Sequence, residues 1–351
     1  MKGQQTLFKQ VKWLALIALA IFLSGCFDSA DKKIQVKLSG RTMGVDYHIT
    51  YVDVAKNSEK VARTRQTVID DLLKTVNKQM STYDKSSELS LFNQSTSLEP
   101  FTVSENTAKV VKESIRLAEL TEGKLDITIG PLVNLWGFGP NMRPETLPDA
   151  AALAHAKSLV GIDNLSVTAN TLTKAIPELY VDLSTTAKGF GVDVVADYLT
   201  LEGVTDYLVE IGGEVRVSGK ANPVRDWVLA IEKPISTHRA VQEYISPRDN
   251  GLATAGDYRQ YFEEGGKRFS HIIDPDDGMP IRHKLVSVTV IHPSCMTADG
   301  LSTAIMLMGP QDGLKFAQAQ NLAAYLVTKT DSGFETVYTK PFESYIVKSI
   351  Q

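Results

Sequence analysis

The clearest periodic pattern in the chain is a run of apolar residues at helical spacing in its first third. Between Ser58 and Met80 apolar side chains recur every three or four positions, as at Ile69, Leu72 and Val76. This spacing places them on one face of an α-helix. The same pattern predicts further helices after Ser104, after Pro148 and Asp149, over Ala187–Leu201 and over residues 297–308, with Gly309-Pro310 ending the last and a short helix following.

Strand patterns dominate the second half of the chain. In the first half, only residues 45–52 alternate as a half-buried strand does, and residues 179–183 form a short apolar run of the buried type. Further strands are predicted at Tyr207–Ile211, 227–231, Val241–Ile245, 269–273 and 285–291. Helices mostly in the first half and strands in the second predict an α+β fold with a largely antiparallel sheet. No long linker divides the halves, so residues 34–351 are predicted to form a single large domain.

The N-terminus has the composition of a targeting segment. Lys2, Lys9 and Lys12 precede an unbroken apolar run of 11 residues, 13–23. A membrane-spanning helix needs about 20 apolar residues, so this run indicates the core of a signal peptide instead. We therefore expect residues 1–25 to be a signal peptide.

The end of that segment suggests a lipid anchor. Leu23-Ser24-Gly25-Cys26 resembles the bacterial lipobox, in which the cysteine becomes the lipidated first residue. The alternative is an ordinary signal peptide cleaved nearby, with Cys26 incidental. We expect Cys26 to be lipidated, with residues 26–33 forming a polar tether and the protein anchored to a membrane outside the cytoplasm.

Cysteine and charge content narrow the class of protein. If Cys26 carries lipid, Cys295 is the only other cysteine, so no intrachain disulfide can form and the core alone must hold the fold. Removing residues 1–25 deletes three lysines and no acids, which lowers the formal charge from −4 to −7. This mild acidity gives no support to nucleic-acid binding, and we expect none.

The predicted helix over residues 297–308 carries a cluster of oxygen-bearing side chains. Asp299 and Thr303 are four residues apart and share a helix face with Ser302. Hard oxygen ligands of this kind suit Mg²⁺ and a phosphate substrate, and we expect the three to form an exposed triangle. The simpler alternative is that Thr297 caps the helix and Asp299 only complements its positive end.

His271 is the best candidate for a general base. It stands in the sequence His-Ile-Ile-Asp-Pro, within a predicted strand and close to Asp274. A histidine with an ordinary pKa near 6.5 can accept a proton at neutral pH, although a single histidine is often structural. No zinc-type Cys/His spacing and no Gly-x-Ser-x-Gly motif is present.

Three further segments permit either a structural or a binding role. The strand at 179–183 leads through a polar turn to a helix, whose first amides and Lys188 could bind an anion. Asp182 could accept a hydrogen bond from a ligand or cap the turn. Segment 130–140 is too rich in Gly and Pro for a regular element, and predicts aromatic packing or a wall for a planar ligand. Gly212-Gly213-Glu214 predicts a bulge or tight turn.

Taken in order, these segments resemble the FAD:protein FMN transferases, the ApbE-type flavin transferase family of bacterial periplasmic lipoproteins. The resemblance extends from about Thr42 to the C-terminus. It rests on Thr42-Met43-Gly44, Met80-Ser81-Thr82-Tyr83-Asp84, Ser87-Glu88-Leu89-Ser90, Val181-Asp182-Leu183-Ser184, Gly256-Asp257-Tyr258 and Ala298-Asp299, on residues 126–140 and on the His271 segment.

The resemblance implies an enzyme that moves FMN from FAD to a threonine or serine hydroxyl of an acceptor protein and releases AMP, with Mg²⁺ as cofactor. It implies His271 as the base. The implied FAD contacts are Met43, Tyr83, Lys124, Leu125, Asp126, Asp182, Lys188 and Ile273, and the implied Mg²⁺ ligands are Thr185 through its carbonyl, Asp299, Ser302 and Thr303. The alternatives are a Mg²⁺-dependent FAD pyrophosphatase and an FAD-binding lipoprotein without turnover.

The resemblance also suggests where the enzyme acts. It implies acceptors among the flavin-bearing subunits of membrane redox pumps, such as sodium-pumping NADH:quinone reductase. It implies a place on the periplasmic side of a bacterial membrane, inner or outer. The chain departs from the family pattern at Gly300, usually alanine, at Ser302, sometimes aspartate, and at Lys188, sometimes glutamate.

Overall fold

The computed structural model describes residues 33–54, 58–140, 146–235, 240–257, 261–264 and 267–348. The predicted signal peptide, Cys26 and residues 26–32 of the tether lie outside these residues, as does Tyr258 of the family motif. Within the described residues, no helix combines the length and the apolar character needed to cross a bilayer.

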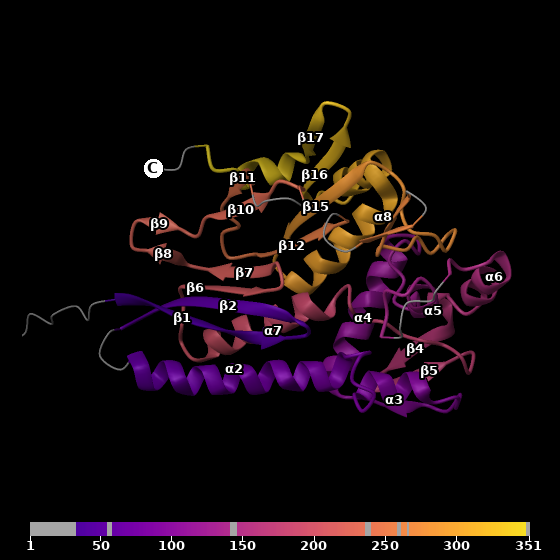
Figure 1. The fold of residues 1–351 in the computed structure, drawn as a ribbon. Coiled ribbons are helices and arrows are strands. Elements are labelled where there is room, and N and C mark those ends of the chain that lie inside the picture. The colour runs from indigo at the N-terminus through magenta and orange to yellow at the C-terminus, as the bar shows by residue number, and fades with distance from the viewer. Residues whose placement is uncertain are drawn as a thin grey trace, which may run out of the picture.

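An eight-stranded antiparallel sheet runs through the molecule (Figure 1). Its strand order is β1-β2-β6-β7-β12-β15-β16-β17, and each pairing is antiparallel. The bounds are β1 (Lys33–Thr42), β2 (Val45–Val54), β6 (Tyr207–Ile211), β7 (Glu214–Ser218), β12 (Gly251–Gly256), β15 (Leu285–His292), β16 (Ala323–Thr330) and β17 (Gly333–Tyr338). The predicted α+β class and antiparallel sheet are confirmed, although a hairpin from the start of the chain supplies one edge.

Three helices cover one face of this sheet. They are α2 (Ser58–Met80), α7 (Ala187–Leu201) and α8 (Cys295–Ala319). Side chains alternate across the strands, so Val209 of β6 packs toward α2 and α7 while Val217 of β7 points to the other face. That second face is covered by the β10 (Leu229–Glu232) and β11 (Val241–Ile245) pair and by η4 (Lys340–Tyr345).

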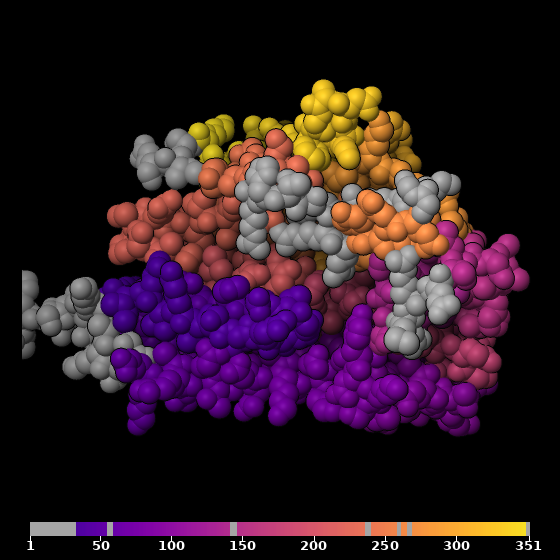
Figure 2. Space-filling view, viewed as in Figure 1, coloured from indigo at the N-terminus to yellow at the C-terminus, as the bar shows by residue number. Residues whose placement is uncertain are grey.

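A smaller lobe lies beside the sheet and is joined to it by α4 (Glu105–Leu120), as Figures 1 and 2 show in magenta. Its three-stranded sheet has the order β3-β5-β4. The lobe comprises α3 (Glu88–Gln94), β3 (Phe101–Thr102), α5 (Gly130–Leu135), α6 (Ala150–Ser158), η3 (Ile162–Asn164), β4 (Leu165–Thr168) and β5 (Thr171–Lys174). The remaining hairpins are β8 (Lys220–Asn222) with β9 (Arg225–Asp226), and β13 (Tyr261–Glu264) with β14 (Lys267–Ser270).

Several predicted elements have the predicted bounds, because local patterns and caps agree with the packing. The helices α2 and α7 and the strands β6 and β11 match their predicted ranges. Ser104 caps α4 by accepting the amide of Thr107, and Asp149 caps α6 by accepting that of Ala152. The predicted break after the last helix is also present, since Gly309 has a non-helical backbone within α8.

Four predictions about elements were wrong, and one of them is the strand over residues 269–273, since β14 ends at Ser270. Residues 179–183 form no strand, although all of them but the half-buried Tyr180 are buried. The Val181 amide donates instead to Asn93 Oδ1 at 2.8 Å. The segment predicted to be irregular begins with helix α5. The helix predicted from Thr297 begins two residues earlier and is capped by Ser294, because the Ser294 hydroxyl accepts the Thr297 amide.

Candidate active site

Helices α7 and α8 begin in direct contact with each other. A Cβ atom at Gly189 in α7 would lie 2.4 Å from the carbonyl oxygen of Cys295, the first residue of α8. Only glycine permits this approach of two backbones. The approach brings Asp299 to the first turn of α7, where its Oδ2 accepts a hydrogen bond from the Gly189 amide at 3.0 Å. Asp299 therefore caps α7, since the side chain of Thr186, the residue before α7, makes no capping bond.

A buried ionic cluster surrounds Asp299. The ammonium of Lys188 lies 3.5 Å from Asp299 Oδ1 and 3.1 Å from Oε1 of Glu214. Both carboxylates are 4% exposed. Burial raises the pKa of Glu214 to about 8 and also raises the pKa of Asp299, although Lys188 opposes both shifts. Burial alone would lower the pKa of Lys188, but the two carboxylates raise it above its ordinary value, so the ammonium stays charged.

Glu214 was not among the predicted site residues. The sequence around it predicted a bulge or tight turn, and that turn is confirmed: Gly212 and Gly213 have φ of 62° and 110° and connect β6 to β7. The sequence feature that could have identified Glu214 is a charged residue at the first position of a short strand rich in valine. Glu214 Oε2 is buried without a hydrogen-bond partner, which leaves an unpaired acceptor in the cluster.

The hydroxyl residues implied as metal ligands lie at the same crossing. Ser302 is buried, and its hydroxyl donates to the carbonyl oxygen of Asp299 at 2.9 Å. Thr303 is half-buried in the next position, and Thr185 stands two residues before α7. The expected exposed triangle is wrong, because Asp299 and Ser302 are enclosed where α8 packs on β12, β15, α4 and α7.

The donor set at this crossing fits a hard divalent cation. One carboxylate with hydroxyl and carbonyl oxygens is typical of Mg²⁺, which keeps several waters and takes phosphate oxygens. The Thr185 Oγ1 is buried without a hydrogen-bond partner, so this oxygen has an unsatisfied lone pair that a bound cation or its water could fill. Over the described part of the chain, no group of three or more His, Cys, Asp or Glu side chains could hold a metal, so a zinc-type site has no support there.

Asp182 and Asp126 lie on adjacent backbone segments of the small lobe. The Asp182 amide donates to the carbonyl oxygen of the residue after Asp126 at 2.7 Å. Each carboxylate closes a turn, Asp182 by accepting the Ser184 amide at 2.8 Å and Asp126 by accepting the Thr128 amide at 2.7 Å. Burial raises the pKa of both carboxyl groups. Tyr83 is 69% exposed and near enough for the Asp182 charge to add to the effect of burial, so both raise the phenol pKa.

His271 is connected to Tyr83 through Phe138. The His271 and Phe138 rings meet edge-on with centroids 6.3 Å apart, and the Tyr83 hydroxyl donates to the Phe138 carbonyl oxygen at 3.3 Å. His271 follows β14, which ends at Ser270, so the prediction that it lies within a strand was wrong. The aromatic packing considered for segment 130–140 is present, since Phe138 also stacks on Phe262 at 5.4 Å.

The segment after His271 is anchored by an ion pair. Lys124 Nζ lies 3.1 Å from Asp274 and 2.6 Å from Asp276. Ile273 is buried and forms an isolated bridge with Pro280. In this structure Lys124 therefore holds the loop that carries the candidate base.

Two other implied FAD contacts are Leu125, which is buried, and Met43, which is half-buried. Leu125 is 2% exposed and packs in the core with Leu117 and Leu301. Met43 lies in the β1–β2 turn in the left-handed backbone region, with φ of 49°, and its side chain reaches Gly191 of α7. Leu125 can meet a ligand mainly through backbone atoms.

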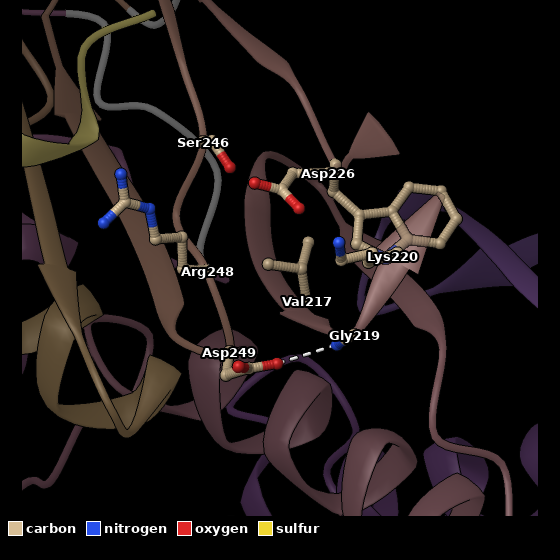
Figure 3. Close-up of a pocket in the computed structure, with 8 residues that line it drawn as sticks. Val217, Gly219, Lys220, Asp226, Ser246, Arg248 and Asp249 are labelled. Carbon is tan, nitrogen blue, oxygen red and sulfur yellow. Dashed lines mark hydrogen bonds between the residues drawn. The ribbon is translucent and has the colours of Figure 1, made fainter. Parts of the chain in front are cut away.

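A separate hollow lies at the far end of β7 (Figure 3). It encloses about 220 Å³, below the roughly 300–1,000 Å³ of typical small-molecule sites. None of the candidate residues lines it. The lining residues are Val217, Gly219, Lys220, Asp226, Trp227, Ser246, Arg248 and Asp249.

Residues 43–326 match the ApbE family. The chain belongs to the ApbE family. A FAD:protein FMN transferase of Vibrio cholerae is 52% identical over 96% of this chain and 99% of its own length. One from Escherichia coli K12 is 38% identical over 95% of this chain and 97% of its own. The predicted family and enzyme class, a transferase, are confirmed.

Solved structures of ApbE proteins share the fold. The flavin transferase ApbE from Vibrio cholerae gives a TM-score of 0.83 at 53% identity, and the match covers 90% of this chain and all of that one. The apo form of Pseudomonas stutzeri flavinyl transferase ApbE gives 0.82 at 36% identity, covering 91% of this chain and 98% of that one. The fold is therefore that of flavin transferases over nearly all the described residues.

Proposed function

We propose that this ApbE-family transferase moves FMN from FAD to a threonine or serine hydroxyl of an acceptor protein in a Mg²⁺-dependent reaction that releases AMP. The observation that carries the proposal is the α7–α8 crossing. There a buried carboxylate is fixed by an amide through one oxygen and faces Lys188 with the other, next to the buried Ser302 hydroxyl. FAD is the implied substrate of the relatives named above.

The residues divide into roles by position. Asp299, the Thr185 carbonyl, Ser302 and Thr303 would hold Mg²⁺, which supplies charge neutralisation at the diphosphate when bound. Lys188 would balance phosphate charge beside it. Met43, Tyr83, Lys124, Leu125, Asp126, Asp182 and Ile273 would line the FAD site, with Tyr83 offering an exposed ring for stacking.

The proton chemistry falls to His271. Its ring is held edge-on against Phe138, on a loop fixed by the Lys124–Asp274 ion pair. From there it would accept the proton of the acceptor hydroxyl as the new bond to phosphorus forms. The bond between phosphorus and the oxygen that joins it to AMP then breaks, and AMP departs.

The test separates transfer from hydrolysis. The protein is incubated with FAD and Mg²⁺, with and without an acceptor domain, and AMP, free FMN and flavin on protein are measured by mass spectrometry. We expect FMN covalently bound to the acceptor and one AMP per FMN transferred, with both lost when EDTA removes the metal. Free FMN as the sole flavin product would make the enzyme a pyrophosphatase, and intact FAD would make it a carrier.

The acceptor and the location are part of the proposal. We propose acceptors among flavin-bearing subunits of membrane redox pumps, of the sodium-pumping NADH:quinone reductase type, reached from the periplasmic side of a bacterial membrane. The lipobox-like sequence ending at Cys26 supports the location, and the family resemblance supports the class of acceptor. We expect Cys26→Ser to move the protein from the membrane to the soluble fraction, as measured by fractionation and immunoblotting. Retention of that variant in the membrane fraction would contradict the lipid anchor.

A further inference from the structure

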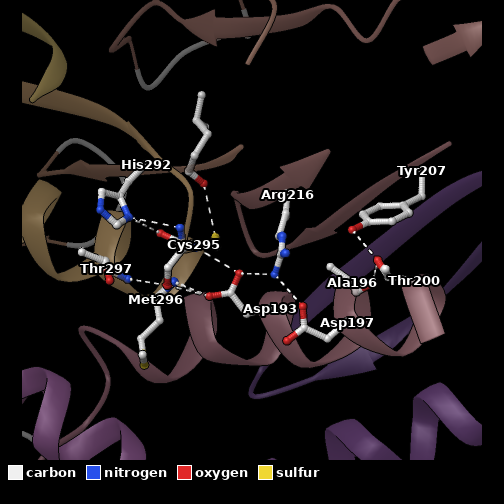
Figure 4. Close-up of polar contacts among 12 residues, drawn as sticks. Asp193, Ala196, Asp197, Thr200, Tyr207, Arg216, His292, Cys295, Met296 and Thr297 are labelled. Atoms are coloured by element: carbon white, nitrogen blue, oxygen red, sulfur yellow. Dashed lines mark hydrogen bonds and ion pairs between the residues drawn. The ribbon is translucent and has the colours of Figure 1, made fainter. Parts of the chain in front are cut away.

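A second buried carboxylate, that of Asp193 in α7, lies at the α7–α8 crossing and accepts hydrogen bonds from the start of α8 (Figure 4). Asp193 of α7 is 8% exposed and points at the first residues of α8. Its Oδ2 accepts the Ser294 hydroxyl at 2.8 Å and the Met296 amide at 3.1 Å, and its Oδ1 accepts the Cys295 amide at 3.1 Å. One side chain thus satisfies two of the free amides at the start of α8.

The two carboxylates make the capping reciprocal. Asp193 belongs to α7 and caps α8, while Asp299 belongs to α8 and caps α7 through the Gly189 amide. Between them the backbones touch at Gly189 and Cys295. Three hydrogen bonds to Asp193 and one to Asp299, made across one tight backbone contact, fix how far α8 can slide along α7.

Strand β7 connects Asp193, which caps α8, to the ionic cluster around Asp299. Glu214 and Arg216 are two residues apart, so they project from the same face of the strand. Glu214 pairs with Lys188, and Arg216 Nη1 lies 3.1 Å from Asp193 Oδ1 and 2.9 Å from Asp197 Oδ1. Strand β7 therefore holds α7 at three of its residues, Lys188, Asp193 and Asp197.

We propose that Asp193 is a positioning residue for the transfer reaction: it sets the axial position of α8 and thereby aims Asp299. The inference rests on the proposed role of Asp299 in holding Mg²⁺. Asp193 itself lies at the buried start of α8, whereas Asp299 stands four residues into that helix beside Lys188. A displacement of about 1 Å in a reacting constellation can cost roughly 100-fold in rate, so α8 need move little for the effect to be large.

The test compares Asp193→Asn with Asp197→Asn. Asparagine keeps the shape of Asp193 but places a donor against the α8 donors. Asp197 pairs with the same Arg216 Nη1 atom, but among the described residues it makes no hydrogen bond to α8, and its side chain is 58% exposed. Mg²⁺ binding is measured calorimetrically on the protein without FAD, alongside the midpoint of thermal unfolding, FAD affinity and kcat. For Asp193→Asn we expect Mg²⁺ affinity to fall about tenfold or more and kcat by about 10- to 100-fold, with FAD affinity within about threefold. Asp197→Asn should match the wild type.

The outcomes are distinguishable. A merely structural Asp193 would lower the thermal midpoint and leave the Mg²⁺ affinity of the folded protein unchanged, which would overturn the inference. A wild type that transfers FMN without binding Mg²⁺ would instead overturn the metal assignment in the proposed function. If Asp193→Asn does not fold, Ser294→Ala removes one hydrogen bond to the same carboxylate, together with the cap on the Thr297 amide. A loss of a few-fold in Mg²⁺ affinity is expected there, and an unchanged affinity would contradict the inference.

Discussion

Replacing Asp299 with asparagine is expected to reduce FMN transfer by about 10³-fold while the protein stays folded. Metal-held charge at a phosphoryl group is worth several kcal/mol, and each ~1.4 kcal/mol is tenfold in rate. Asparagine keeps an oxygen that can accept the Gly189 amide, so the cap on α7 survives. What is lost is the negative charge that faces Lys188 and would face the metal.

The measurements for Asp299→Asn are AMP release, flavin bound to the acceptor and Mg²⁺ affinity. A matched control is Asp312→Asn on the same helix, whose carboxylate is exposed and, among the described residues, pairs with Lys315 alone. We expect the control to behave as the wild type. Near-normal transfer by Asp299→Asn at limiting Mg²⁺ would remove Asp299 from the metal site.

The local spacing of apolar residues correctly predicted those elements in which the apolar face is also the buried face. Helix α2 has an apolar stripe and one buried face, so its bounds follow from periodicity alone. Residues 179–183 show the opposite case. Leu179, Val181 and Leu183 are apolar and buried. The Val181 and Asp182 amides, however, pair with Asn93 and with the loop at residue 127, partners that only the tertiary fold brings near.

The candidate site was predicted in part for the same reason. Asp299, Ser302 and Thr303 could be placed on one helix from their spacing, but not their burial, which depends on α7 and the sheet. Glu214 and Asp193 were missed because each stands alone in an ordinary strand or helix sequence. Their roles arise from Lys188 and from the start of α8, which are distant in sequence.

Substituting alanine for His271 is expected to lower FMN transfer by about 10²- to 10⁴-fold, the usual contribution of a general base, with FAD and Mg²⁺ binding retained. The loop should keep its place, because the Lys124–Asp274 ion pair and the Ile273–Pro280 bridge do not depend on the imidazole. This result would differ in kind from that of Asp299→Asn, where metal affinity also falls.

The control for His271→Ala is His155→Ala, an exposed position on α6. Added imidazole tests the chemistry directly, since a free base that enters the gap beside Phe138 can take the acceptor proton again. Partial recovery with imidazole, in the variant alone, is expected for a lost base. Unchanged turnover in His271→Ala would assign the ring to packing and remove His271 as the base.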